Sequence, residues 1–189
     1  MAHDAPGPST TTGSPSSREG EDAQLEADAR ALASVVRMRI LRLCLDEALT
    51  NKEIADRLGK DPATTFHHVR TLAERGFLAA GPERRGARGA REVPYRATGR
   101  SWRAPRGPEL DQVLINTFLE EVRESDPHSL RTIRLGLRLD AAGRDELERR
   151  IVGVLQEFVD RPSDPHATPY SIFYALHEDA ARSRPASTD

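Results

Sequence analysis

The stretch KEIADRLGKDPATTFHHVRTLAERGF, residues 52–77, contains the signals of two helices separated by a glycine. Thr50 or Asn51 caps the first helix, and Glu53 completes a capping box if Thr50 is the cap. Gly59 ends this helix, because glycine readily adopts the left-handed backbone found at helix C-termini. The first element is therefore the short helix KEIADRL.

The second helix of the stretch begins after Asp61, a good N-cap, and Pro62 occupies its first turn, where a missing N–H costs nothing. Gly76 ends this second helix, and the residues of its inner side recur at helical spacing. The inner positions are Thr65, Val69, Leu72 and Ala73. A short helix, a tight turn and a longer capped helix predict a helix-turn-helix, preceded by a further helix that Ser34 caps.

The residues after this pair predict a β-hairpin. Phe77 and Leu78 suit the start of one strand, while Val93 and Tyr95 alternate with polar neighbours on the return. Pro94 weakens the second strand or places it at a sheet edge, since proline cannot donate to a ladder. The tip between the strands is long, basic and glycine-rich, so we interpret the hairpin as a wing.

This arrangement resembles the ArsR-type winged-helix regulators over about residues 27–100. LASVVRMRILRLC resembles their opening helix, KEIADRLGKDPATTFHHVRTLAERGFL their helix-turn-helix, and the Arg-rich hairpin ending in YRAT their wing. His68 matches the family's histidine, although Val69 follows it instead of leucine, and Phe66 stands where the family commonly has a serine that reaches DNA. YSIFYALHED near the end resembles the extension of an actinobacterial branch. The resemblance implies a DNA-binding transcriptional regulator.

Charge is unevenly distributed along the chain. The net charge is −2, but residues 51–106 hold 13 Lys and Arg against 6 Asp and Glu, a local balance of +7. Residues 81–106 alone hold eight arginines and two glutamates. A solvated charged face is the ordinary reading of such a run, yet its position beside the helix-turn-helix favours contact with nucleic acid.

Helical geometry selects the candidate DNA contacts. At about 100° per residue, His67 and Arg70 lie opposite the buried Val69, whereas His68 lies on the flank, so the two histidines diverge. His67 either contacts DNA or is simply exposed, and packing under the helix is the stronger reading for His68. The predicted DNA-binding set is Asn51, Lys52, Thr64, Thr65, His67, His68, Arg70, Thr71, Arg84, Arg85, Arg88 and Arg91.

The C-terminal half predicts a dimerisation extension. A helix over residues 109–124 carries a broad apolar stripe that we expect to pack on a partner. Residues 131–139 and 169–177 alternate like half-buried strands around a helix over 144–161, a small α/β unit with parallel or antiparallel strands. The predicted dimer residues are Leu110, Val113, Leu114, Phe118 and Val122.

The fold class expected is α+β, a winged helix-turn-helix followed by this extension. The predicted boundaries are a disordered tail over 1–22, the DNA-binding domain over 23–100, the extension over 101–178 and a second tail over 179–189. The single cysteine fits a reducing cytoplasm, and no apolar run suits a signal peptide or a membrane span.

Enzyme readings have little support, because GxSxG, HExxH, P-loop and paired-cysteine zinc motifs are absent from the sequence. No cofactor or metal is predicted, although Asp126 and His128 with His166 and His177 are a conceivable metal cluster. We expect a homodimeric repressor of double-stranded promoter DNA, without a membrane partner and with an unidentified small-molecule or protein effector. The alternatives are a winged-helix protein-interaction module and a metal-responsive regulator.

Overall fold

The computed structural model describes residues 15–86, 89–104, 107–162, 164 and 166–183. The chain divides into two units, Met1–Glu120 and Glu121–Asp189, which are described separately below. No described helix is long and apolar enough to span a membrane.

The helix-turn-helix forms with the predicted caps. α2 spans Val35–Leu43, α3 Asn51–Leu58 and α4 Pro62–Glu74. Thr50 is the N-cap of α3, and its capping box with Glu53 is complete, while Gly59 ends the helix at φ 61°. The Asp61 carboxylate accepts hydrogen bonds from the first free N–H groups of α4. The structure thus confirms the order of helices that these local signals predicted.

Three strands form the sheet beside these helices, in the order β1-β5-β2. β1 is Leu49–Thr50, β2 is Leu78–Ala80 and β5 is Pro94–Ala97, and all pairings are antiparallel. Pro94 was expected to weaken its strand or to place it at a sheet edge, and the edge position is wrong because β5 is central. Pro94 is the first residue of β5, where its missing N–H is tolerated and its carbonyl accepts from Gly81 N at 2.7 Å.

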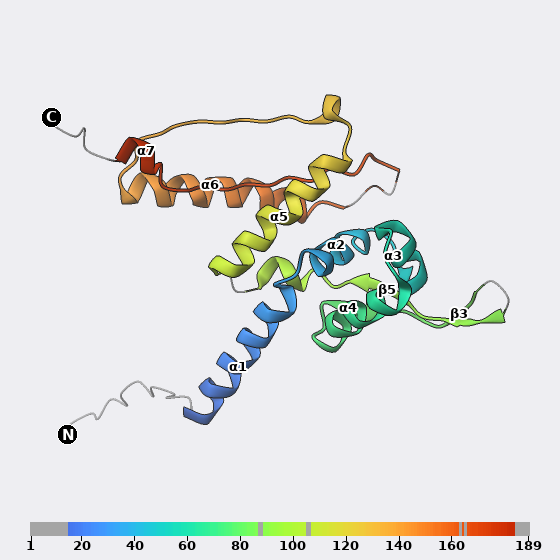
Figure 1. Ribbon diagram of the computed structural model, residues 1–189. Helices are drawn as coiled ribbons and strands as arrows, with labels where there is room; N and C mark the ends of the chain where they lie inside the picture. The colour runs from blue at the N-terminus through green and yellow to red at the C-terminus, as the bar shows by residue number, and fades with distance from the viewer. Residues whose placement is uncertain (1–14, 87–88, 105–106, 163, 165, 184–189) are drawn as a thin grey trace, which may run out of the picture. The chain divides into compact units, whose positions relative to one another are not determined.

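The wing extends from this sheet as a separate two-stranded ladder (Figure 1). β3, Arg84–Arg85, pairs with β4, Arg91–Glu92. A 3₁₀ turn, η2, follows the sheet at Arg100–Arg103. The first unit is therefore a winged helix-turn-helix.

One core joins the elements of this unit. Its buried side chains come from α2, α3 and α4 and from β2, which follows them. The helix α5, Pro108–Glu124, adds Leu110. The core residues include Leu32, Ile40, Cys44, Leu49, Ile54, Val69, Leu72 and Phe77. Because Val69 and Leu72 are inward, the opposite side of α4 is left for solvent.

The N-terminal helix α1, Pro15–Leu32, was not predicted. It covers residues 15–22 of the tail expected to be disordered, while residues 1–14 lie outside the described part. The segment EDAQLEADARAL consists mainly of good helix formers, but most of it was placed in the DNA-binding domain without being assigned to a helix. Its C-terminal end buries Ala31 and Leu32 in the core.

The second unit contains η3, Pro127–Ser129, the long helix α6, Ala141–Val159, and the short helix α7, Ala180–Ser183. The two predicted strands are absent from its described residues: 131–139 and 169–177 are extended but belong to no ladder. The prediction that Val154 and Phe158 would lie inside was also wrong, since both are exposed. An alternating sequence predicts that one face of the segment is covered. A strand forms only if a second strand also lies alongside to accept its backbone hydrogen bonds.

Candidate nucleic-acid interface

The outward side of α4 gathers the polar residues that helical geometry predicted. Thr64, His67 and Arg70 are exposed, and Thr71 is half-buried with its hydroxyl donating to the His67 carbonyl at 2.9 Å. The N-terminal half of the helix therefore presents side chains that hydrogen-bond DNA bases or phosphates in other proteins.

Thr65 does not belong to this surface, and its assignment as a DNA contact is corrected. It is fully buried, and its hydroxyl donates to the Asp61 carbonyl at 2.9 Å. The helix wheel already placed Thr65 beside Val69 on the inner side, so the two predictions made for it were incompatible.

The two adjacent histidines differ in environment, as expected from their divergence. His67 is exposed and meets the Phe66 ring edge-on, with 6.3 Å between ring centroids. His68 is half-buried, and burial lowers its pKa, helped by the positive charges of Arg37 and Lys60. A neutral, partly packed His68 agrees with the structural reading preferred for it.

Phe66 is a candidate that sequence reasoning set aside. Phe66 is 46% exposed beside the polar residues of this face, where burial gives no reason for a phenylalanine. The departure from serine noted in the sequence was the available signal. An aromatic ring at such a position can contact the methyl group of thymine in the major groove.

Two predicted cations on the helix pair have acidic partners one turn away. Arg70 Nε lies 2.6 Å from Glu74 Oε1, and Lys52 Nζ lies 2.8 Å from Asp56 Oδ2. The hydrogen bond from each cation to its carboxylate raises the pKa of both Arg70 and Lys52. Because both pairs are largely exposed, they are weak enough for either cation to exchange its partner for a phosphate.

Asn51 connects the two motif helices. Its Nδ2 donates to the Pro62 carbonyl at 2.8 Å, so the start of α3 is tied to the start of α4. Its Oδ1 is buried without a partner among the described residues. The side chain is therefore committed inside the motif, which leaves Lys52 as the exposed cation for a phosphate at this end.

The wing arginines differ in their surroundings. Arg84 Nη2 lies 2.6 Å from Glu53 Oε1 on α3, and Arg91 Nε lies 2.9 Å from Glu83 Oε2. Arg85 is exposed and has no ion-pair partner within the described part of the chain, while the predicted contact Arg88 lies outside that part. Arg84 is thus held against α3 by its acidic partner, whereas Arg85 is available to contact a phosphate. Arg96, which is exposed on the central strand β5, was not among the predicted DNA contacts. The available signal was the alternation of Val93 and Tyr95 with polar neighbours in the sequence.

The stripe predicted for dimer contact is divided along α5. Leu110 is buried in the core of the first unit and Leu114 packs against that core, so this chain already covers part of the stripe. Val113, Phe118 and Val122 are half-buried, whereas Ile115 and Leu119 are exposed. A dimer contact on this helix stays a prediction.

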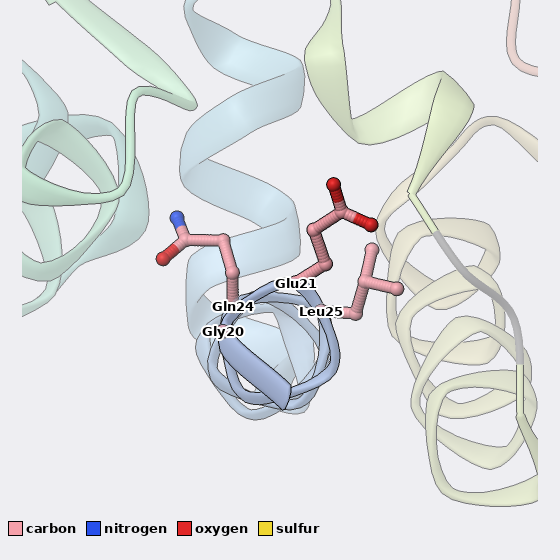
Figure 2. Close-up of a pocket in the computed structure, with 4 residues that line it drawn as sticks. All are labelled: Gly20, Glu21, Gln24 and Leu25. Carbon is pink, nitrogen blue, oxygen red and sulfur yellow. The ribbon is translucent and has the colours of Figure 1, made fainter. Parts of the chain in front are cut away.

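Other parts of the described chain offer little for a ligand or metal. Gly20, Glu21, Gln24 and Leu25 line a hollow on α1, all from one helix and none from the predicted site (Figure 2). Among the described residues, no three His, Cys, Asp or Glu side chains gather as a metal site.

Sequence comparison finds one family. Residues 44–82 match the helix-turn-helix domain of the IclR family, a part of the chain that contains α3, α4 and β2. The family model and the fold are both those of DNA-binding transcription regulators. The match covers less than half of the chain, and no curated protein is detectably similar.

Solved structures with partial likeness to this chain include three that are about 20% identical to it. The homodimeric winged helix-turn-helix DNA-binding domain of Mb0332 from Mycobacterium bovis, a possible ArsR-family transcriptional regulator, is 19% identical with a TM-score of 0.40, covering 65% of this chain and 100% of its own. An ArsR-like transcriptional regulator from Rhodococcus sp. RHA1 is 19% identical with a TM-score of 0.37, covering 76% and 98%. Reduced HlyU from Vibrio cholerae is 20% identical with a TM-score of 0.36, covering 55% and 95%.

Proposed function

We propose that the protein is a sequence-specific regulator of transcription that binds double-stranded DNA with α4 in the major groove. The carrying observation is the exposed face of α4, which presents Phe66, His67 and Arg70 on a helix whose inner residues Val69 and Leu72 are fully buried. Hydrogen-bonding and apolar groups at this spacing can read base edges. Lys52 and Arg85 would supply phosphate contacts on either side of the reading face.

The finer proposal is an ArsR-type repressor that acts as a homodimer in the cytoplasm. Two copies would place two α4 helices in successive major grooves and exclude RNA polymerase from a promoter. The C-terminal unit would respond to an unidentified effector by changing the spacing of the two DNA-binding units. The ArsR-type resemblance of the motif and the basic wing support this assignment.

Selection from a pool of random duplexes tests the proposal. The full chain should enrich a defined sequence, and titration at several salt concentrations should give tighter binding to that duplex than to a scrambled one. A control protein with an unrelated fold and a comparable basic patch should bind both duplexes alike, since phosphate attraction carries no sequence information. No enrichment, or equal affinity for both duplexes, would contradict sequence-specific binding.

One observation supports a second candidate, a winged-helix module that binds protein. Unpaired arginines are what a phosphate-binding wing needs, and Arg84 and Arg91 have acidic neighbours in Glu53 and Glu83. Paired arginines carry less free charge for phosphates. The duplex titration separates the two candidates, because a protein-binding module would show neither enrichment nor a steep salt dependence.

A further inference from the structure

The C-terminal end of α4 is held by residues that are far from it in the sequence. Asp28 of α1 is buried, and each of its carboxylate oxygens accepts from one arginine. Oδ1 accepts from Nε and Nη2 of Arg75, the C-cap of α4, at 2.8 and 2.5 Å. Oδ2 accepts from Nη2 of Arg100, which lies in η2, at 2.5 Å. We call these three residues the Asp28 cluster, and it connects α1, α4 and η2 through one acid.

Arg100 also bonds directly to the backbone at this end of the helix. Its Nη1 donates to the Arg75 carbonyl at 2.7 Å, and its guanidinium lies 5.4 Å from the centre of the Phe77 ring. Arg75 in turn donates to the Gln24 carbonyl of α1 at 3.0 Å. The end of α4 is therefore joined to α1 through a side chain and a backbone carbonyl, and to η2 through Arg100.

The Asp28 cluster is not needed to end the helix. Gly76 turns the chain at φ 71°, and the N–H groups of Gly76 and Phe77 donate back to carbonyls of the last turn at 3.0 and 2.8 Å. These two bonds are those of a Schellman motif, which completes a helix end with local residues alone. The cluster instead joins positions that are 47 and 72 residues apart. It therefore adds a tertiary constraint to a helix end that is already complete.

Stability alone is a weak reason for a buried cluster of charges. Removing a carboxylate and its arginines from water costs free energy that their attraction only roughly recovers, so apolar side chains of similar volume often stabilise a fold as well. Apolar contacts lack direction, however, whereas the hydrogen bonds of Asp28 and Arg100 have a fixed geometry. The Asp28 side chain is 5% exposed, so water competes little for its oxygens. The cluster is therefore better suited to orient α4 than to stabilise it.

The Asp28 cluster gives α4 a second fixed end. The first turn of α4 is tied to α3, because Asn51 Nδ2 donates to the Pro62 carbonyl at 2.8 Å. A helix tied at one end can pivot about it, and a hydrogen bond to a base edge is lost when its donor moves by less than about 1 Å. We infer that Asp28 and Arg100 are positioning residues for the reading of DNA, which hold the far end of α4 and keep its exposed side chains in one direction. This inference rests on the proposed function and deepens it.

A positioning role predicts an effect on DNA binding that is opposite to the effect of charge. Asp28→Asn removes a negative charge and keeps the shape of the side chain, so phosphate attraction alone would tighten binding to every duplex. Loss of the helix position should instead weaken binding to the selected duplex about tenfold, as expected for about one lost base contact. Binding to random DNA should stay equal or become slightly tighter. The ratio of the two affinities therefore falls, although the net charge has become more favourable for DNA.

Two further variants make the test specific. Glu26→Gln is the matched control, because Glu26 lies on the same helix and forms an exposed pair with Arg30. It changes the charge as Asp28→Asn does and should leave the affinity ratio unchanged. The apolar variant, Asp28→Leu with Arg75→Met and Arg100→Met, guards against misfolding. It replaces the whole cluster, so it should remain folded and still lose the same discrimination between the two duplexes.

Titration of the full chain against the selected and a random duplex measures the affinity ratio, and urea unfolding shows whether each variant is folded under the same conditions. The salt slope of Asp28→Asn should equal that of the wild type, because no phosphate contact is removed.

Four outcomes would overturn the inference. They are a wild-type ratio in either folded cluster variant, an equal loss of the ratio in Glu26→Gln, an equal weakening on both duplexes, and a failure of both cluster variants to fold. Equal weakening would make the arginines phosphate contacts, and failure to fold would make the cluster a requirement of stability. A wild type that does not distinguish the two duplexes would contradict the proposed function, and this inference with it.

Discussion

The Glu53 carboxylate lies 2.6 Å from the guanidinium of Arg84, so the N-terminus of α3 and the base of the wing are joined by a single side chain. The other carboxylate oxygen accepts from the Thr50 N–H at 2.8 Å and from its hydroxyl at 2.9 Å. The Thr50 backbone hydrogen bond is the main reason why the pKa of Glu53 is lowered, and Arg84 adds to it. The position of the wing is thereby linked to the geometry of the helix-turn-helix.

Replacing Glu53 should separate these two roles. Glu53→Gln retains a capping side chain but loses the charge facing Arg84, so we expect a stability loss below about 1 kcal/mol and faster trypsin cleavage in the wing. Glu53→Ala loses both interactions and should cost about 1 kcal/mol more. Urea unfolding and timed proteolysis measure the two effects. Glu47→Gln, which breaks the exposed Arg57 pair, is the control, and equal wing cleavage in it would contradict the link.

His68 should make stability depend on pH. Burial lowers its pKa below the ordinary 6.5, so the unfolded chain takes up a proton before the folded chain as pH falls. The contribution of neutral His68 is present above pH 6.5 and is lost as pH falls through its folded value. His68→Gln should flatten the unfolding free energy between about pH 7 and 5. Equal curves for wild type and His68→Gln would refute this.

Arg70 and Arg85 should affect DNA binding in different ways. If Arg70 reaches a base edge, Arg70→Ala should cost about 1–3 kcal/mol on the selected duplex and less on random DNA. Arg85→Ala should weaken both duplexes together and lower the salt slope by about 1. Titrations of both variants at several salt concentrations measure this. Loss of discrimination in Arg85→Ala but not in Arg70→Ala would reverse the two assignments.

Phe66 should matter for binding and hardly at all for folding. Because Phe66 is 46% exposed, Phe66→Ala should change the unfolding free energy by less than about 0.5 kcal/mol. If the ring contacts a thymine methyl, the variant should lose preference for thymine at one position of the selected site. Replacing that thymine with uracil removes the methyl and should weaken the wild type only. A full response to uracil in Phe66→Ala would argue against the contact.

The buried Asp28 should be the most sensitive charged residue of the first unit. Its carboxylate accepts from Arg75 Nε at 2.8 Å and from Arg100 Nη2 at 2.5 Å, which ties α1 to the end of α4 and to η2. Asp28→Ala leaves the partly exposed guanidinium groups of Arg75 and Arg100 without their acid and should cost about 1–3 kcal/mol in urea unfolding. Glu26→Ala breaks only an exposed pair with Arg30 and serves as the control. A similar small loss in both variants would show that the buried cluster is not stabilising.

The sequence specified those elements whose determinants are local. Caps at Thr50 and Asp61 and the terminating Gly59 and Gly76 lie within a few residues of the helices they bound, so α3 and α4 were predictable. The central place of β5 was not, because its neighbour β1 is only two residues long and precedes it by more than forty positions. The partners of Arg84 and Asp28 depend equally on distant segments.

The C-terminal unit shows a different limit. Alternation at 131–139 predicted a half-buried strand, but these residues are exposed and join no ladder, because alternation alone does not tell which strand lies alongside. The same holds for Leu110 and Leu114, whose stripe indicated a covering surface that the first unit partly provides itself. A pattern indicates burial, whereas the identity of the covering surface depends on tertiary or quaternary contacts.

Cys44 makes the folded core measurable with a simple reagent. It is the single cysteine of the chain, it is fully buried among the core residues, and burial raises the pKa of its thiol to about 11. Both factors suppress thiolate chemistry, so alkylation requires the core to open. The rate of labelling therefore reports the opening of the DNA-binding unit directly, without an introduced probe, and remains readable when the C-terminal unit is altered.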